Sequence, residues 1–406
     1  MTFQSLPLHP KILKAIEDLG HTQPTPIQSL AIPKVMEGVD LRASAQTGTG
    51  KTAAFLLPAI NRLAESNPSA SKAGPRVLVL VPTRELAMQV ATESAKYCKH
   101  LPHVRTVCIY GGAPYPIQNR ELSRPYDILV ATPGRLIDHL ERGRIRLGRI
   151  EMLILDEADR MLDMGFIEPV ERIASGTPKE RQTLMFSATM KGTVMSLSRR
   201  LLKNPMEVSV EPDQKELDNI EQRVHSVDNL EHKYRLLDHL LSDETVTQAI
   251  VFTATKHQAD TLADKLHREG HLAEPLHGDM NQRQRTRTIA GLRRGEIRVL
   301  VATDVAARGI DVRTITHVFN FDLPSTEEDY VHRIGRTGRA GATGIATSFA
   351  AYKDLQTVRR IEQFTGKKIN SIVIPGFEPK FKPQAKPAGG RGKSWGPKRR
   401  FGSRRF

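Results

Sequence analysis

Short runs of apolar residues recur along the chain, and each is followed by a small or polar cluster and then by a helix-like stretch. The runs lie at 77–81, 128–131, 152–155, 183–186, 249–252, 299–302 and 318–321. Apolar runs without alternation are typical of strands buried on both faces, and their alternation with helical stretches indicates parallel βαβ units. In such sheets ligands bind beyond the carboxyl ends of the strands, which is where these polar clusters fall.

The length and one polar stretch predict how these units are grouped. A chain of 406 residues holds about two or three domains. The acidic and polar stretch 211–219 contains one proline and one large apolar residue, and it divides the apolar runs into two series. We therefore expect an α/β protein with two parallel-sheet domains in tandem. The expected divisions are 1–29, 30–210, 211–219, 220–375 and 376–406.

The positive charge of the chain is concentrated at its C-terminal end. Sixty Lys and Arg against 45 Asp and Glu give a net charge of +15, of which 376–406 carries +9 and 1–375 only +6. This tail has six Gly and four Pro and lacks Leu, Ile and Val, so burial cannot offset its ordering entropy and we expect it to be disordered. The basic balance indicates an anionic partner such as nucleic acid or a membrane surface.

Several classes of protein are excluded. Cys98 and Cys108 cannot form a disulfide framework for a chain of this length, and neither has the spacing of a metal ligand. The N-terminus lacks the basic and apolar regions of a secretory signal. The longest unbroken apolar run has about five residues, far from the roughly 18 of a membrane span. We expect a cytoplasmic protein that does not engage a membrane.

A phosphate-binding loop is the first motif that carries chemistry. It comprises Ala45, Gln46, Thr47, Gly48, Thr49, Gly50, Lys51 and Thr52. Its backbone amides would hold phosphate oxygens at the start of a helix, Lys51 would neutralise phosphate charge, and the Thr52 hydroxyl would hold Mg²⁺. Ala45 stands where the general pattern has its first glycine. The alternative, a chance Gly-rich turn, is disfavoured because Gly-Lys-Thr opens a helical pattern.

Two adjacent carboxylates follow the apolar run at 152–155. A nucleoside triphosphatase needs one carboxylate for the metal ion and another to orient or deprotonate the attacking water. Asp156 would hold Mg²⁺ through a water molecule, and Glu157 would activate the water. An Asp-Glu pair after a strand is more often a solvated turn, but here it follows a phosphate loop by about a hundred residues.

With these two motifs in place, the sequence resembles the DEAD-box RNA helicases over nearly all of 1–375. The resemblance implies two RecA-like domains, ATP and Mg²⁺ as cofactors, and RNA as the partner. Residues 1–29 then correspond to an adenine-reading segment, in which Gln28 makes paired hydrogen bonds to the base and Phe3 is the isolated upstream aromatic residue. His21 departs from the family pattern, because an aromatic residue usually stacks on adenine at this position.

In the second domain, His332-Arg-Ile-Gly-Arg-Thr-Gly-Arg339 matches the arginine-finger segment of the family. By itself this spacing of arginines is most simply a solvated basic face. The resemblance implies that Arg336 and Arg339 stabilise charge at the γ-phosphate. It also implies that Gly309 and Asp311 contact the ribose.

Two further sets of residues are assigned by the resemblance. Asp159, Ser187, Thr189 and His332 would link hydrolysis to strand separation. RNA would be contacted through phosphate and sugar by Arg84, Gly112, Thr132, Arg135, Arg285 and Thr303. Contacts to the 2′-hydroxyl would distinguish RNA from DNA. Ala254 departs from the family pattern, in which a polar or basic side chain is common.

The bacterial RhlE-type group is similar to this chain in three short segments, at 43–48, 159–166 and 374–379. The tail interleaves basic residues with aromatic ones, and this composition predicts a tether for single-stranded RNA. The alternative is an unselective polycation that only increases solubility. Ribosomal or RNA-decay assemblies are candidate settings.

The function expected from the sequence is an ATP-dependent RNA helicase that hydrolyses ATP in an RNA-stimulated manner and locally unwinds or remodels RNA. One rival is an RNA-binding clamp that uses ATP to lock onto RNA and turns over too slowly to unwind. A second rival is a DNA-directed helicase, which Asp159 and the Gln28 segment disfavour.

Overall fold

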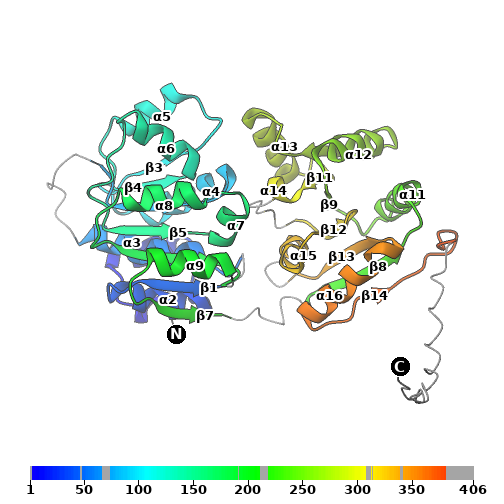
Figure 1. Cartoon of the computed structure of the whole chain (residues 1–406), viewed down its shortest axis with the longest axis horizontal. Coiled ribbons are helices and arrows are strands. Elements are labelled where there is room, and N and C mark those ends of the chain that lie inside the picture. Colours follow the sequence, from blue (N-terminus) through cyan, green and yellow to red (C-terminus); the bar gives the residue numbers. More distant parts are fainter. Residues whose placement is uncertain are drawn as a thin grey trace, which may run out of the picture.

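The computed structural model describes residues 2–45, 48–65, 74–190, 192–210, 218–307, 312, 314–338 and 342–380. Within these residues the chain forms two lobes, each with a seven-stranded sheet and helices packed against it (Figure 1). The strands pair in parallel throughout both sheets of the described chain. The predicted α/β architecture of two parallel-sheet domains in tandem is confirmed.

The first lobe has the strand order β3-β4-β2-β5-β6-β1-β7. Its strands are β1 Leu41–Ser44, β2 Val77–Leu80, β3 Thr106–Ile109, β4 Ile128–Ala131, β5 Met152–Leu155, β6 Gln182–Ser187 and β7 Met206–Ser209. Its helices are α1 Pro10–Asp18, α2 Pro26–Met36, α3 Lys51–Ala64, α4 Arg84–Tyr97, α5 Tyr115–Leu122, α6 Pro133–Glu141, α7 Ala158–Asp163, α8 Ile167–Ser175 and α9 Gly192–Leu201, with a 3₁₀ turn at Phe3–Ser5.

The second lobe has the strand order β10-β11-β9-β12-β13-β8-β14. Its strands are β8 Ile220–Ser226, β9 Ala249–Thr253, β10 Ala273–Leu276, β11 Val299–Thr303, β12 His317–Asn320, β13 Gly344–Ala350 and β14 Asn370–Ser371. Its helices are α11 Leu230–Leu241, α12 Lys256–Arg268, α13 Gln282–Arg294, α14 Asp304–Ala307, α15 Glu327–Ile334 and α16 Leu355–Thr365, with a 3₁₀ turn at Tyr352–Asp354.

Each sheet is buried on both faces, as the unbroken apolar runs predict. Along β2, Val77 and Val79 pack into one apolar cluster of the first lobe, while Leu78 and Leu80 pack into the cluster on the opposite face. In the second lobe, Ile250 and Phe252 of β9 enter one cluster and Val251 enters the other. Because side chains alternate along a strand, this division requires helices on both sides.

The sequence does not predict β1 as a strand, although β1 lies inside the first sheet. Its residues alternate between buried and half-buried, and Arg42 occupies one of the half-buried positions. The Arg42 guanidinium donates to Ser198 Oγ at 3.3 Å and pairs with Glu207. The long side chain therefore reaches polar partners beside the sheet, and this breaks the apolar run that would have revealed the strand.

The C-terminal boundary of the second lobe lies further along the chain than the sequence predicts. After β14, the Phe377 ring stacks on His239 of α11 with centroids 4.8 Å apart, and the Phe377 carbonyl lies 3.1 Å from His232 Nε2. The Lys380 amide donates to Asp228 Oδ2 at 2.8 Å. The prediction of disorder from residue 376 is therefore wrong for 376–380, because an aromatic ring there finds a partner on α11. Residues 381–406 lie outside the described part of the chain.

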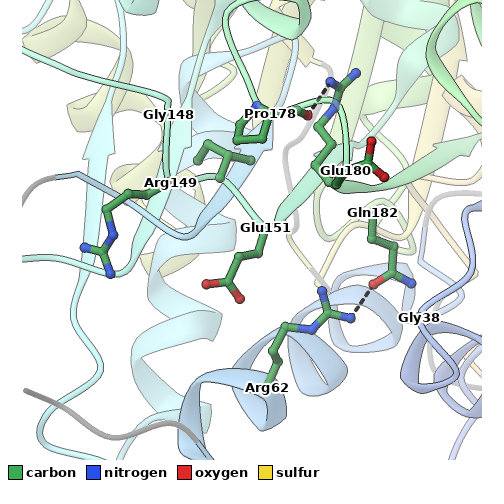
Figure 2. Close-up of a pocket in the computed structure, with 10 residues that line it drawn as sticks. Gly38, Arg62, Gly148, Arg149, Glu151, Pro178, Glu180 and Gln182 are labelled. Carbon is green, nitrogen blue, oxygen red and sulfur yellow. Dashed lines mark hydrogen bonds between the residues drawn. The ribbon is translucent and has the colours of Figure 1, made fainter. Parts of the chain in front are cut away.

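A pocket of about 540 Å³ opens at the amino ends of β1, β5 and β6 (Figure 2). Gly38, Glu151 and Gln182 come from the starts of these strands, and Arg62 of α3 donates to Gln182 Oε1 at 2.6 Å. The polar motifs follow the carboxyl ends of the strands, so this pocket lies at the other edge of the sheet. Among the described helices, none is both long and apolar enough to span a membrane.

Candidate active site between the two lobes

The phosphate loop connects β1 to the start of α3. Gly48 and Gly50 have φ angles of +95° and +90°, which glycine adopts without the strain that a side chain would add. Gly50 is the N-cap of α3, so the amides of the first helical turn point toward the loop. Lys51 is buried at 6% exposure, and its Nζ has no hydrogen-bond partner among the described residues. A buried ammonium group beside a helix N-terminus suits an anionic ligand.

Gln28 joins the N-terminal segment to this loop. Its Oε1 accepts from the Thr25 amide at 3.0 Å, and its Nε2 donates to the Gly50 carbonyl at 3.0 Å. A Cβ atom at Gly50 would lie 2.4 Å from Gln28 Nε2, so only glycine permits this approach. Gln28 therefore fixes the loop, and its paired contact with adenine stays a prediction.

The other adenine-segment residues differ in exposure. Phe3 is 5% exposed and packs into an apolar cluster of the first lobe, whereas His21 is exposed. Gln46 and Thr47 lie outside the described residues. So do Gly309, Asp311 and Arg339 of the second lobe.

Two carboxylates lie at the end of β5. Asp156 is 2% exposed and Glu157 is 5% exposed. Burial raises the pKa of Asp156 to about 6, while the nearby Lys51 ammonium opposes this rise. The Glu157 amide donates to Asp156 Oδ1 at 2.9 Å. Glu157 has a φ of +52°, a left-handed conformation that is uncommon outside glycine and that clusters at functional sites.

The donor atoms here fit Mg²⁺ bound together with a nucleotide. The described residues contain no group of three or more His, Cys, Asp or Glu side chains able to hold a metal ion. Mg²⁺ commonly takes one or two protein oxygens and completes its shell with water and substrate phosphates. One buried carboxylate, Asp156, and the Thr52 hydroxyl beside the phosphate loop are donors of that kind.

Asp159 connects the end of β5 to the end of β6. Its Oδ2 accepts from the Ala188 amide at 3.0 Å and from the Thr189 amide at 3.1 Å. The Asp159 amide donates to Ser187 Oγ at 3.3 Å. The structure thus brings together the predicted coupling residues Asp159, Ser187 and Thr189, because β5 and β6 are neighbours in the sheet.

The second lobe presents arginines to a pocket between the lobes. A pocket between the lobes is lined by Arg160 of the first lobe and, from the second lobe, by Phe252, Asp304, Ala307, Asp329, His332, Arg333 and Arg336. Arg336 is 5% exposed, and its Nε donates to the His332 carbonyl at 3.1 Å. The structure therefore places Arg336 and His332 where the two lobes meet.

Arg333 has a different role from the neighbouring arginines. Its guanidinium makes two bonds to the Asp304 carboxylate, at 2.6 and 2.7 Å, and lies 4.9 Å from the Phe252 ring centroid. It is 3% exposed, so this bidentate pair fixes α15 against the end of β11. The spacing of the arginines in the sequence does not show which of them, Arg333 or Arg336, forms the ion pair with Asp304.

The predicted RNA-binding residues of the first lobe lie on α4, α6 and the loop before α5. The Arg84 guanidinium packs on the turn at Gly112, where a Cβ would lie 2.2 Å from Arg84 Nη1. Thr132 is the N-cap of α6 and is 7% exposed. Arg135 is 9% exposed, donates to the Ala113 carbonyl at 2.9 Å, and lies 4.2 Å from the Tyr115 ring centroid.

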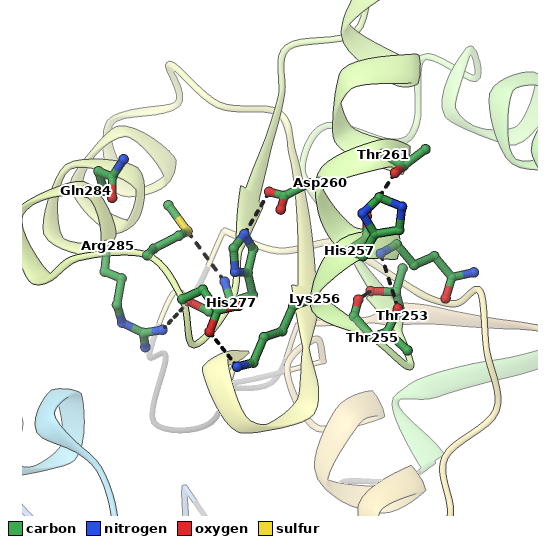
Figure 3. A network of polar contacts seen from close by, with 12 residues as sticks. Thr253, Thr255, Lys256, His257, Asp260, Thr261, His277, Gln284 and Arg285 are labelled. Carbon is green, nitrogen blue, oxygen red and sulfur yellow. Dashed lines mark hydrogen bonds and ion pairs between the residues drawn. The ribbon is translucent and has the colours of Figure 1, made fainter.

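The two lobes touch through this same surface. The Arg285 guanidinium of α13 forms an ion pair with Glu85 of α4 at 2.6 Å, and each side chain is 8% exposed. Arg285 is also held within its own lobe. Its Nη1 donates to the carbonyl of His277, which lies in the turn before α13, at 3.2 Å (Figure 3). Arg84 Nη1 donates to Gln282 Oε1 at 3.3 Å.

Thr303, at the end of β11, is 9% exposed and lies in the same lobe as Arg285. The sequence predicts that Arg285 contacts RNA, and it gives no sign of the ion pair between Arg285 and Glu85. A pair 200 residues apart leaves no local pattern in the sequence.

These features define a phosphate-loop protein with two RecA-like lobes that face each other across a charged site. Two family models match the chain: DEAD/DEAH box helicase over residues 25–197 and Helicase conserved C-terminal domain over residues 232–341. The DeaD RNA helicase of Mycobacterium tuberculosis is 45% identical over 93% of this chain, which spans 66% of that relative's length. SrmB of Escherichia coli is 43% identical, with 93% of this chain and 85% of SrmB covered.

RhlB of Pseudomonas syringae is 44% identical, with 92% of this chain and 95% of RhlB covered. The chain belongs to the DEAD-box ATP-dependent RNA helicases, and the predicted family is confirmed. The RhlE-type group within the family stays a prediction.

Solved structures agree with this fold. Saccharomyces cerevisiae Dbp5 bound to RNA and ADP BeF3 has a TM-score of 0.82 and 33% identity, with 91% of this chain and 95% of Dbp5 covered. A Dbp5 variant bound to nup159, gle1, IP6 and ADP has a TM-score of only 0.63, with 90% of this chain and 95% of that chain covered.

We predict that the buried His139 makes the first lobe sensitive to acid. His139 is fully buried, and its Nε2 lies 3.1 Å from Gln118 Oε1 beside Arg135. Burial lowers the pKa of His139, and the neighbouring Arg135 charge lowers it further. The unfolded chain therefore takes up a proton as the pH falls below about 6.5, while the folded chain resists it, and stability decreases.

Urea unfolding between pH 7 and pH 5 measures this effect. The wild type should lose up to about 1.4 kcal/mol per pH unit more than the His139→Asn variant. His103→Asn, at an exposed position, is the control and should follow the wild type. Parallel pH curves for the wild type and His139→Asn would refute the assignment.

Proposed function

We propose that this chain is an RNA-stimulated ATPase that locally unwinds short RNA duplexes or remodels RNA–protein complexes. One observation carries the proposal: Arg160 of the first lobe, which forms an ion pair with Glu157, lines one pocket together with Arg336 and His332 of the second lobe. Relatives of similar length are named ATP-dependent RNA helicases, and the solved Dbp5 and Mss116p structures contain RNA together with nucleotides.

The phosphate loop binds the nucleotide. The amides at the start of α3 and the Lys51 ammonium hold the phosphates, and Gln28 with the N-terminal segment holds the adenine. Arg336, with Arg339, approaches the γ-phosphate from the second lobe and stabilises charge that develops in the transition state. Gly309 and Asp311 hold the ribose.

The carboxylates of β5 perform the hydrolytic step. Glu157 accepts a hydrogen bond from the attacking water and takes its proton as the bond to the γ-phosphorus forms, while the bond between that phosphorus and the ADP oxygen breaks and ADP leaves. Thr52 and, through water, Asp156 would hold Mg²⁺, which would neutralise charge on the phosphates when it is bound. Asp159 transmits the change to Ser187 and Thr189 through the hydrogen bonds that join the ends of β5 and β6.

RNA is bound along the surface that both lobes form around α4, α6 and α13. Arg84, Gly112, Thr132 and Arg135 contribute from the first lobe, and Thr303 with Arg285 from the second lobe. Because these contacts reach phosphate and sugar, they position a strand without reading its bases. RNA that bridges the lobes favours the arrangement in which Arg336 meets the nucleotide, so ATP hydrolysis depends on RNA.

The domain division follows from these roles. Residues 1–29 read adenine, 30–210 hold the nucleotide, 211–219 link the lobes, and 220–375 supply the arginines. A basic RNA tether then follows, and the packing of Phe377 moves its start to residue 381. Ribosomal or RNA-decay assemblies are the proposed setting, and the RhlE-type group is the proposed subgroup.

We predict that Glu157→Gln strongly slows RNA-stimulated ATP hydrolysis and preserves binding. The amide keeps the shape of the side chain but cannot take a proton, so the rate should fall at least about a hundredfold. ATPase is measured with and without single-stranded RNA, and binding is measured with a nonhydrolysable ATP analogue. Glu180→Gln, whose side chain is 93% exposed, is the matched control and should behave as the wild type.

The rival functions give different results in the same assays. A clamp would bind RNA with ATP yet show little hydrolysis in the wild type. A DNA-directed enzyme would be stimulated equally by matched DNA and RNA strands. Wild-type ATPase that RNA does not stimulate, or full activity in Glu157→Gln, would refute the proposal.

We also predict that a chain ending at Lys380 binds RNA with a weaker dependence on salt. The tail 376–406 carries +9 of the net charge of +15, and all of that net charge lies after Lys380, because Glu378 and Lys380 cancel. Every phosphate that the shorter chain leaves unbound should reduce the log–log salt slope by about 0.7 for a single strand. ATPase at saturating RNA should persist, because the described motifs all precede this point.

The sole tryptophan, Trp395, offers a second readout for the full chain. Its fluorescence should change when RNA is added. An unchanged salt slope together with unchanged fluorescence would show that the basic segment only increases solubility.

A further inference from the structure

Arg160 is a buried charged residue that the motifs leave without a role. It belongs to α7, where it follows Ala158 and Asp159, and its side chain is 2% exposed. Neither Nη1 nor Nη2 has a hydrogen-bond partner among the described residues. Burying a guanidinium group with two unpaired nitrogens costs free energy. We therefore expect the positive charge of Arg160 to interact with a nearby acidic group.

Arg160 forms an ion pair with the proposed water-activating group. Arg160 Nε lies 3.5 Å from Glu157 Oε2, and the two side chains are 2% and 7% exposed. This distance is too long for a strong hydrogen bond, and Glu157 Oε2 makes none among the described residues. The attraction between the charges is nevertheless strong, because water is largely excluded around both groups. Arg160 therefore restricts where the Glu157 carboxylate can lie.

The other side of Arg160 faces the second lobe. Among the described residues that line the inter-lobe pocket, Arg160 alone comes from the first lobe, and the others include Asp304, Asp329 and Arg336. The pocket has a volume of about 10 Å³, close to the minimum that holds one water molecule. Arg160 thus lies between Glu157 and the surface that arrives when the lobes close.

The backbone conformation of Glu157 allows Arg160 to restrain the Glu157 carboxylate. With φ at +52° and ψ at 50°, Glu157 begins α7 in a left-handed conformation, and Arg160 follows one helical turn later. The two side chains can therefore meet on one face of the turn. When the second lobe covers Arg160, it excludes solvent from the pair and strengthens the attraction that orients Glu157.

We propose that Arg160 is a positioning residue that couples lobe closure to hydrolysis by holding the Glu157 carboxylate in the orientation that activates water. This inference rests on the proposed ATPase function. Arg160 does not touch the nucleotide, and it acts through Glu157 alone. Replacing it should therefore slow the chemical step and leave ligand binding and lobe closure intact.

The test compares Arg160→Met with the wild type in the full chain. Misplacing a catalytic group by about 1 Å can cost about a hundredfold in rate, so kcat for RNA-stimulated ATPase should fall between about tenfold and a hundredfold. KM for ATP, and the affinity for a labelled single-stranded RNA in the presence of ADP-BeF3, should change less than about twofold, because Arg160 contacts neither ligand. Arg160→Lys keeps the charge and should recover part of kcat.

A second comparison shows whether the effect passes through Glu157. In single-turnover hydrolysis with excess protein, adding Arg160→Met to Glu157→Gln should cause no further loss, since residues that act as one unit are not additive. Arg172→Met is the matched control, because Arg172 belongs to an exposed pair with Glu141 at 2.8 Å. It should match the wild type.

Three results would overturn the inference: an unchanged kcat in Arg160→Met, a loss of RNA affinity with ADP-BeF3 as large as the loss in kcat, or full additivity with Glu157→Gln. Failure of the ATPase proposal itself looks different. In that case the wild type would show no RNA stimulation, or Glu157→Gln would remain active.

Discussion

The parallel order of three neighbouring strands determines the geometry of the active site. β5, β6 and β1 lie side by side in the first sheet. The segment after β1 is the phosphate loop, the segment after β5 carries the carboxylates, and the segment after β6 is Ser-Ala-Thr. Since parallel strands end at the same edge, these three segments become neighbours although they are far apart in the sequence. The burial of Lys51 and Asp156 and the bonds of Asp159 follow from this order.

The second constraint is that the proposed site draws its residues from both lobes. Arg336 and His332 belong to the second lobe, while Lys51 and Glu157 belong to the first. Contacts on the proposed RNA surface connect the lobes directly, above all the buried pair of Glu85 and Arg285. A buried pair of this kind contributes mainly when both partners are present, because either charge left alone in that environment is costly. This pair therefore connects the arrangement of the lobes to the proposed RNA surface.

Much of this organisation can be predicted from the sequence, but contacts between distant residues cannot. Apolar runs identify the central strands, because these strands are buried on both faces, and they miss β1, whose half-buried Arg42 interrupts the pattern. The residues of the phosphate loop are contiguous in the sequence, and so are the two carboxylates after β5. Both motifs can therefore be recognised without the fold. Arg285 and Arg135 were expected to contact RNA, and the structure places both guanidinium groups against protein partners. Phe377 extends the folded lobe because it meets His239.

We propose that closure of the two lobes makes ATP hydrolysis depend on RNA, and an exchange of charges across the Glu85–Arg285 pair tests this dependence. RNA-stimulated ATPase is measured for Glu85→Arg, for Arg285→Glu and for the double variant. Each single variant places like charges together, so the RNA concentration for half-maximal activity should rise roughly tenfold or more. The double variant restores an opposite pair and should recover most of the activity. Single variants that match the wild type, or a double variant no better than the singles, would contradict the account.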